Sequence, residues 1–189
     1  MNFIQRSQYE VWANFRVAKK SVDHIREFFI NEIGVQPESL VKNLHLTVYH
    51  SRRPMPNVKE TKVSCILSVD TMETRFMVLA PGGENPRPDL IPADRKIGIR
   101  IHRTSQLRIP IEKYRSRFFL HENRRILGKR KPSTKLKSAF GARHFQPHIA
   151  LLLPGNNMPL DLKTIGDAFR DYVQEIHFDQ FQIISRRNV

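Results

Sequence analysis

Apolar residues alternate with polar ones in several segments and recur at helical spacing in others. Over residues 10–18 the alternation places Val11, Ala13, Phe15 and Val17 on one face of a strand. The same criterion predicts strands at residues 43–48, 62–69, 74–80, 96–102, 146–151 and 175–185. Helical spacing predicts one helix from an N-cap at Ser21 to Gly34, one from Pro110 to about Leu127, and one after Asp161.

The order of these elements indicates an α+β fold with two similar lobes. A strand and then a helix precede the predicted strand at residues 43–48, and the same order precedes the one at 146–151, which is a weak internal repeat. Between residues 81 and 94, four prolines and two glycines predict an exposed loop. The 189 residues fit one well-buried domain spanning 1–189.

Two predicted strands each begin with a histidine, roughly a hundred residues apart. Side chains alternate along a strand, so His45 and Thr47 share one face, and His148 and Ala150 do likewise. If the two strands are neighbours in one sheet, both imidazoles open into one cleft. One ring then accepts a proton while the other donates one, which suits phosphodiester cleavage without a metal.

The residues around both histidines resemble motifs of a known family. Residues 145–151, Phe-Gln-Pro-His-Ile-Ala-Leu, and residues 44–48, Leu-His-Leu-Thr-Val, are similar to the motifs of the two-histidine (2H) phosphoesterase superfamily. That superfamily includes 2',3'-cyclic nucleotide phosphodiesterases and 2'-5' RNA ligase-like proteins. Residues 44–48 with the following Ser51, Arg52 and Pro54 also resemble phage members that cleave cyclic oligonucleotide signals of bacterial immunity.

The resemblance implies a bilobal fold, with two antiparallel-sheet lobes and outer helices around a central cleft. It also implies that His45 and His148 are the acid–base pair and that Thr47 holds phosphate. Ala150 departs from the pattern, because the family carries Thr or Ser at this position. By analogy with deleting one oxyanion donor, the missing hydroxyl costs ~10²–10³ in rate. A backbone N–H, a water molecule or Arg143 are candidates to replace it.

Three explanations of Ala150 stay open: a divergent active enzyme, a binding-only descendant, or a variant altered to trap a ligand. We favour the active enzyme, because a proton-transfer pair is harder to replace than one hydroxyl donor. The alternatives are cleavage of cyclic oligonucleotide messengers and noncatalytic RNA binding. The sequence does not assign the acid and the base, the physiological substrate or the oligomeric state.

Further substrate contacts are predicted close to the first histidine. Trp12 and Tyr49 are candidates for stacking on a base, a contact worth ~1–3 kcal/mol. Tyr49 is the stronger candidate, since strict alternation places it on the face of His45. For Trp12 we favour an ordinary core or edge position over stacking on a base. Ser51 and Arg52 are candidates for holding phosphate or are surface residues.

The positive charge of the chain is concentrated in one stretch. The net charge is +14, and residues 95–143 carry 16 Lys or Arg against two acids, while the rest of the chain is balanced. Such a field attracts polyanions, so RNA or a nucleotide is the expected partner. The alternative is a solvated basic helix and loop that serves solubility or nonspecific contact.

Several classes of protein are disfavoured by what the chain lacks. It has no run of ~20 apolar residues that would span a membrane, and its first residues do not form a signal peptide. A single cysteine, Cys65, excludes an intramolecular disulfide and fits the cytoplasm. Neither a phosphate-binding loop, a nucleophile elbow nor a carboxylate cluster is present, so we expect no metal and no cofactor.

Overall fold

The computed structural model describes residues 11–51, 55, 58–79, 95–127, 146–155 and 161–185. Of residues 119–127 it describes only the backbone. The strands are β1 (Val11–Val17), β2 (His45–Ser51), β3 (Thr61–Asp70), β4 (Thr74–Leu79), β5 (Lys96–Ile101), β6 (His148–Leu152) and β7 (Glu175–Ser185). The helices are α1 (Lys19–Glu27), followed by a π-helical turn (Phe28–Glu32), α2 (Arg108–Leu127) and α3 (Leu162–Tyr172), with short 3-10 turns at Pro37–Ser39 and Thr71–Glu73.

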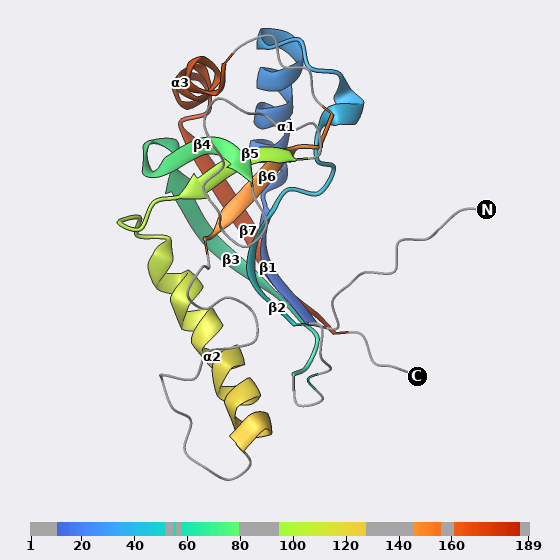
Figure 1. The fold of residues 1–189 in the computed structure, drawn as a ribbon, viewed down its shortest axis with the longest axis vertical. Helices are drawn as coiled ribbons and strands as arrows, with labels where there is room; N and C mark the ends of the chain where they lie inside the picture. The colour runs from blue at the N-terminus through green and yellow to red at the C-terminus, as the bar shows by residue number, and fades with distance from the viewer. Residues whose placement is uncertain are drawn as a thin grey trace, which may run out of the picture.

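The described strands form one antiparallel sheet in the order β3-β7-β1-β2-β6-β5-β4 (Figure 1). This confirms the α+β class. The units β1-α1-β2 and β5-α2-β6 lie symmetrically about the β2–β6 boundary, as the predicted repeat requires. The two histidine-bearing strands are therefore neighbours at the middle of the sheet.

One row of cross-strand partners forms the centre of the core. It runs over five strands through Phe15, Leu46, Ile149, Ile99 and Phe76, each of which is buried. Tyr114 of α2 packs against Phe15, with 5.5 Å between ring centroids, and Phe169 of α3 packs against Phe76 at 6.0 Å. Helices α2 and α3 thus cover the same face of the sheet, and residues next to this row point to the opposite face.

Of the two predicted N-caps, one is confirmed and the other is wrong. Asp161 is the N-cap of α3, because its Oδ1 accepts from the backbone N–H groups of Lys163 and Thr164 at 2.9 and 3.0 Å. The prediction for Ser21 is wrong, since α1 begins two residues earlier and Ser21 is buried within it. The hydroxyl oxygen of Ser21 instead accepts the backbone N–H of His177, at 3.0 Å, and ties α1 to β7.

The helices are all too short or too polar to cross a lipid bilayer, as far as the described residues extend.

Candidate active site

The two motif histidines lie on one face of the sheet, on adjacent strands. Within the described residues, β2 and β6 pair through Leu46 opposite Ile149, both of them fully buried. Antiparallel geometry then places His45 beside Ala150 and Thr47 beside His148, all on the face away from the core. The two histidines are diagonal neighbours, a relationship that separates such residues by about 7–8 Å and their Cβ atoms by somewhat less.

Both rings are held in the same way. The Nδ1 atom of His45 lies 2.8 Å from the carbonyl oxygen of Asn43, and that of His148 lies 2.8 Å from the carbonyl oxygen of Gln146. A carbonyl oxygen only accepts, so Nδ1 carries the hydrogen in each ring and donates to the residue two positions earlier. The neutral form of each histidine therefore has its basic nitrogen at Nε2.

The surroundings favour the neutral form of both rings. Desolvation is the main cause that lowers the pKa of His45, which is partly buried, and the charges of His148 and Lys96 lower it further. The side chain of His148 is exposed to solvent, but the protein around it still lowers its pKa by desolvation. The positive charges of Lys96 and Arg100 lower this pKa further, by smaller amounts. In both cases the bond to a backbone carbonyl partly opposes the shift. A positive charge on His148 disfavours a second positive charge on His45, as expected for like charges that lie close together.

Trp12 connects Thr47 and His45 from the neighbouring strand β1. Its Nε1–H donates to Oγ1 of Thr47 at 3.4 Å, and its ring lies edge-on against that of His45, with 4.6 Å between centroids. Because the hydroxyl oxygen of Thr47 accepts from Trp12, the hydroxyl hydrogen remains available to another acceptor. Trp12 therefore belongs to the histidine cluster and is not an ordinary core or edge residue.

A buried amide lies beside Thr47. Asn14 is its partner on β1, is fully buried, and accepts a 2.9 Å bond from Nε2 of Gln182 through Oδ1. Its Nδ2 group has no partner among the described residues. A buried donor without an acceptor is unusual in a folded protein. Within the part of the chain that the structure describes, the amide group of Asn14 therefore has a hydrogen-bond donor that is still unused, next to Thr47.

The expectation that Tyr49 shares the face of His45 is wrong. Ala13 pairs with Tyr49 while Asn14 pairs with Thr47, so Val48 is an extra residue that forms a β-bulge. The bulge shifts the alternation, and Tyr49 is turned into the core with 2% of its surface exposed. There it stacks on Phe118 of α2, with 4.7 Å between the ring centroids, and is not available to a base.

The same bulge removes Ser51 from the site. Ser51 is 1% exposed and points into the protein, so it does not offer its hydroxyl to a phosphate. Arg52 and Arg143, the other predicted phosphate contacts, lie outside the described residues. Arg115 of α2 holds the bulge, since its Nη1 donates to the carbonyl oxygen of Val48 at 2.8 Å. Burial lowers the pKa of Arg115 to about 10.

Two basic residues of β5 adjoin the histidines, and neither was among the predicted contacts. Arg100 lies directly opposite His148 in the pairing of β5 with β6, and the positive charge of Lys96 lowers the pKa of both rings. Along this strand, Ile97, Ile99 and Ile101 are buried, so Lys96 and Arg100 occupy the alternate positions on the opposite face. The alternation is readable from the sequence, whereas the pairing of β5 with β6 is not.

Ala150 lies between His45 and Gly98. A Cβ atom on Gly98 would lie only 2.1 Å from the carbonyl oxygen of Ile149 and 3.0 Å from Cα of Ala150. The backbones of β5 and β6 are therefore close together beneath Ala150. The side chain of Leu79 on β4 covers Gly98, because its Cδ1 would lie 2.9 Å from a Cβ atom at that position, whereas Ala150 contributes only a methyl group next to the two imidazoles.

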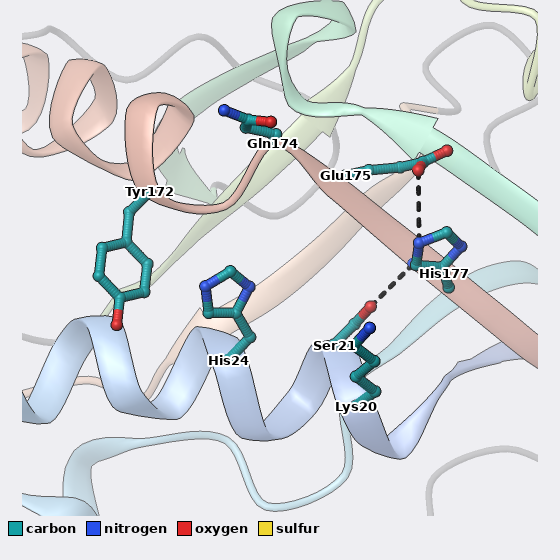
Figure 2. Close-up of a pocket in the computed structure, with 7 residues that line it drawn as sticks. All are labelled: Lys20, Ser21, His24, Tyr172, Gln174, Glu175 and His177. Carbon is teal, nitrogen blue, oxygen red and sulfur yellow. Dashed lines mark hydrogen bonds and ion pairs between the residues drawn. The ribbon is translucent and has the colours of Figure 1, made fainter.

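A separate cavity of about 230 Å³ lies away from the histidine pair, between α1, the end of α3 and the start of β7 (Figure 2). Among its lining residues, the ring of His24 contacts that of Tyr172, with 4.8 Å between ring centroids, and Nε2 of His177 lies 3.3 Å from a carboxylate oxygen of Glu175. Ser21 also lines it but accepts from the backbone of His177 and not from the ring. The cavity therefore lacks an activated nucleophile.

No group of three or more His, Cys, Asp or Glu side chains in the described segments is arranged to hold a metal ion. No protein-family model matches the chain, and no curated protein matches it at a significant level. Its chemistry is therefore inferred from the arrangement of its own residues.

Proposed function

We propose that this protein is a metal-independent phosphodiesterase that acts on 2',3'-cyclic phosphate ends or 2'-5' linkages of RNA or nucleotides. His45 and His148 form its acid–base pair. The observation that carries the proposal is the matched pair of rings on one sheet face, each with Nδ1–H bound to a backbone carbonyl at 2.8 Å. Because both rings have the same tautomer and lie at diagonal positions, their two Nε2 atoms are free to exchange protons with the attacking and departing oxygens on opposite sides of one phosphorus.

The proposed reaction needs one neutral and one protonated ring. Nε2 of the neutral ring takes a proton from water as the water oxygen attacks phosphorus in line. The bond from phosphorus to the departing ribose oxygen breaks, and the protonated ring gives its proton to that oxygen. Proton exchange with solvent then restores the starting state. Either histidine suits either role by its hydrogen bonding.

Charge that builds on the phosphate oxygens requires donors at the same face. Thr47 meets this requirement with a hydroxyl hydrogen that its bond from Trp12 leaves available. Lys96 supplies positive charge near both rings, and Arg100 supplies it near His148. These cations offset the hydroxyl donor that is missing at Ala150.

We also propose that the sheet is organised as two lobes. Strands β3, β7, β1 and β2 form one part, and β6, β5 and β4 form the other. The strands of the two parts pair through Leu46–Ile149, and Leu40 ahead of β2 forms an isolated bridge to Leu152, whereas β4 and β5 pair over six residues and β1 and β2 over a similar length. The histidines flank this narrow junction, so a small relative movement of the two parts changes the gap between the rings.

Incubation of the purified protein with defined substrates tests the proposal. We expect it to open a 2',3'-cyclic phosphate end or to cut a 2'-5' linkage in the presence of EDTA, and we expect His148→Ala to remove turnover while RNA affinity is retained. A cyclic oligonucleotide, assayed in parallel, distinguishes messenger cleavage from RNA processing. Binding of RNA without turnover of any of these substrates would identify a noncatalytic binding protein and overturn the proposal.

A further inference from the structure

We propose that Arg100 and Arg75 form a second phosphate site next to the histidine pair, so that the preferred substrate is an oligonucleotide with at least two phosphates. This inference rests on the proposed function and names the class of substrate for the same face. It makes a cyclic mononucleotide a poor substrate, because such a ligand fills the histidine site alone.

The strand register places the second site in line with the first. Arg100 on β5 pairs with His148 on β6, and Arg75 on β4 pairs with Arg100. Directly opposite residues of antiparallel strands project from the same face, so Thr47, His148, Arg100 and Arg75 form one row across four strands. Figure 1 shows β6, β5 and β4 side by side at this end of the sheet.

The two arginines have no acidic partner among the described residues. Desolvation lowers the pKa of Arg100, and the charges of Arg103, Arg108 and Arg75 lower it further. Arg108 has an ion pair with Glu112 at 3.6 Å, which neutralises one member of this group. Like charges directly opposite each other destabilise a strand pair, so Arg75 and Arg100 repel each other until an anion lies between them.

The geometry fixes how the ligand has to lie. Neighbouring strands are about 4.8 Å apart, so Arg75 is about 10 Å from His148 across the sheet. A ligand that contacts both His148 and Arg75 has to extend across the strands from β6 toward β4, with a negative charge at each end. A chain of nucleotides joined by phosphodiesters fits this requirement. Guanidinium groups also pair with phosphate through two parallel hydrogen bonds, which gives the site directional preference.

A comparison of two substrates tests the inference. One is cytidine 2',3'-cyclic phosphate, and the other is a cytidine dinucleotide that ends in the same cyclic phosphate and has one additional phosphodiester. We expect kcat/KM to be at least ~10-fold higher for the dinucleotide, since one charge-assisted contact is worth about that factor. Arg75→Gln and Arg100→Gln should each lower this ratio toward one. Lys62→Gln on β3 removes the same charge and should leave the ratio unchanged.

Salt and equilibrium binding provide the second readout. Removal of one phosphate contact should reduce the slope of log affinity against log salt by about one. The ligand is the dinucleotide with a 3'-5' linkage and a 2'-O-methyl, 3'-phosphate end, which contains neither a cyclic phosphate nor a 2'-5' linkage to cleave. Weaker binding by Arg75→Gln than by Lys62→Gln supports the second site even if the protein cleaves nothing, in which case only the proposed function fails. Equal kcat/KM for both substrates, or equal binding by both variants, would overturn the second site and leave the proposed function standing.

Discussion

The indole N–H of Trp12 donates to the hydroxyl oxygen of Thr47 across 3.4 Å, from one strand to the next. This contact orients the hydroxyl hydrogen of Thr47 away from Trp12. In the proposed mechanism Thr47 is the phosphate donor, and Trp12 is the residue that positions it. The two residues are therefore expected to act as one unit.

Removal of either partner should reduce turnover through the same step. Thr47→Val is expected to lower kcat by ~10²–10³, as for one oxyanion donor, and Thr47→Ser to retain most of the rate. Trp12→Phe keeps a ring against His45 but loses the N–H, and should cost about tenfold in kcat. In the double variant, the loss should equal that of Thr47→Val alone. Losses that multiply in the double variant would show that Trp12 acts independently of Thr47.

The pH dependence of the reaction follows from the lowered pKa values of both histidines. The kcat/KM profile reports the free enzyme, and its maximum lies between the two pKa values. Burial and neighbouring cations place both below the ordinary value of about 6.5, so we expect a bell-shaped profile with an optimum below about pH 6.5.

Lys96→Gln tests the cause of this shift. The variant loses a positive charge that lowers the pKa of His45 and His148, so the whole profile should move to higher pH. Lys62→Gln on β3 is the matched control and should not move it. An optimum above pH 7 in the unmodified protein, or a profile that Lys96→Gln leaves in place, would contradict the account of the electrostatics.

Arg115 is expected to support the site through the β-bulge. Its side chain is 4% exposed and donates to the carbonyl oxygen of Val48 at 2.8 Å. Arg115→Met leaves that carbonyl without this donor and should lower the free energy of unfolding by ~1–3 kcal/mol, measured by urea denaturation. Because the bulge at Val48 directly follows Thr47, kcat should fall as well under conditions in which the variant stays folded. Lys113→Met, an exposed change on the same helix, should leave both quantities unaltered.

A hydroxyl group restored at residue 150 should increase the rate. Ala150 lies beside His45 on the site face, above the close approach of β5 and β6. Ala150→Ser adds a donor there at little steric cost, and we expect kcat to rise by at least about tenfold, within the range of one oxyanion donor. Ala150→Val adds bulk without a donor and should give no increase. If Ser and Val behave alike in single-turnover assays, residue 150 does not face the phosphate.

Local patterns in the sequence predicted much of the fold because they reflect local physics. Alternation identified β1 and the full extent of β7, and the carboxylate of Asp161 identified the start of α3. Both histidines were predicted to share one face, and the register at Leu46 and Ile149 places them so. Their catalytic role stays a proposal.

The remaining features depend on relationships that no single segment contains. The extra residue Val48 is apolar, and so is its neighbour Tyr49, so the alternation reads equally well with or without a bulge. That ambiguity led Tyr49 to be assigned to the wrong face and Ser51 to be named as a candidate phosphate contact. Arg100 joins the site only because β5 pairs with β6, a long-range contact set by the whole sheet. Ser21 looked like a cap because its bond to His177, 156 positions away, is equally invisible in local sequence.

The proposed mechanism requires His45 and His148 to transfer protons to and from one phosphodiester as a pair. Its most direct test is kcat for opening of a 2',3'-cyclic phosphate end by the unmodified protein, His45→Ala, His148→Ala and the double variant. We expect each single change to lower kcat by ~10²–10⁴ and the double change to lower it scarcely further, because either half of the pair is of little use alone. Turnover that persists in the double variant at the rate of the unmodified protein would contradict the account.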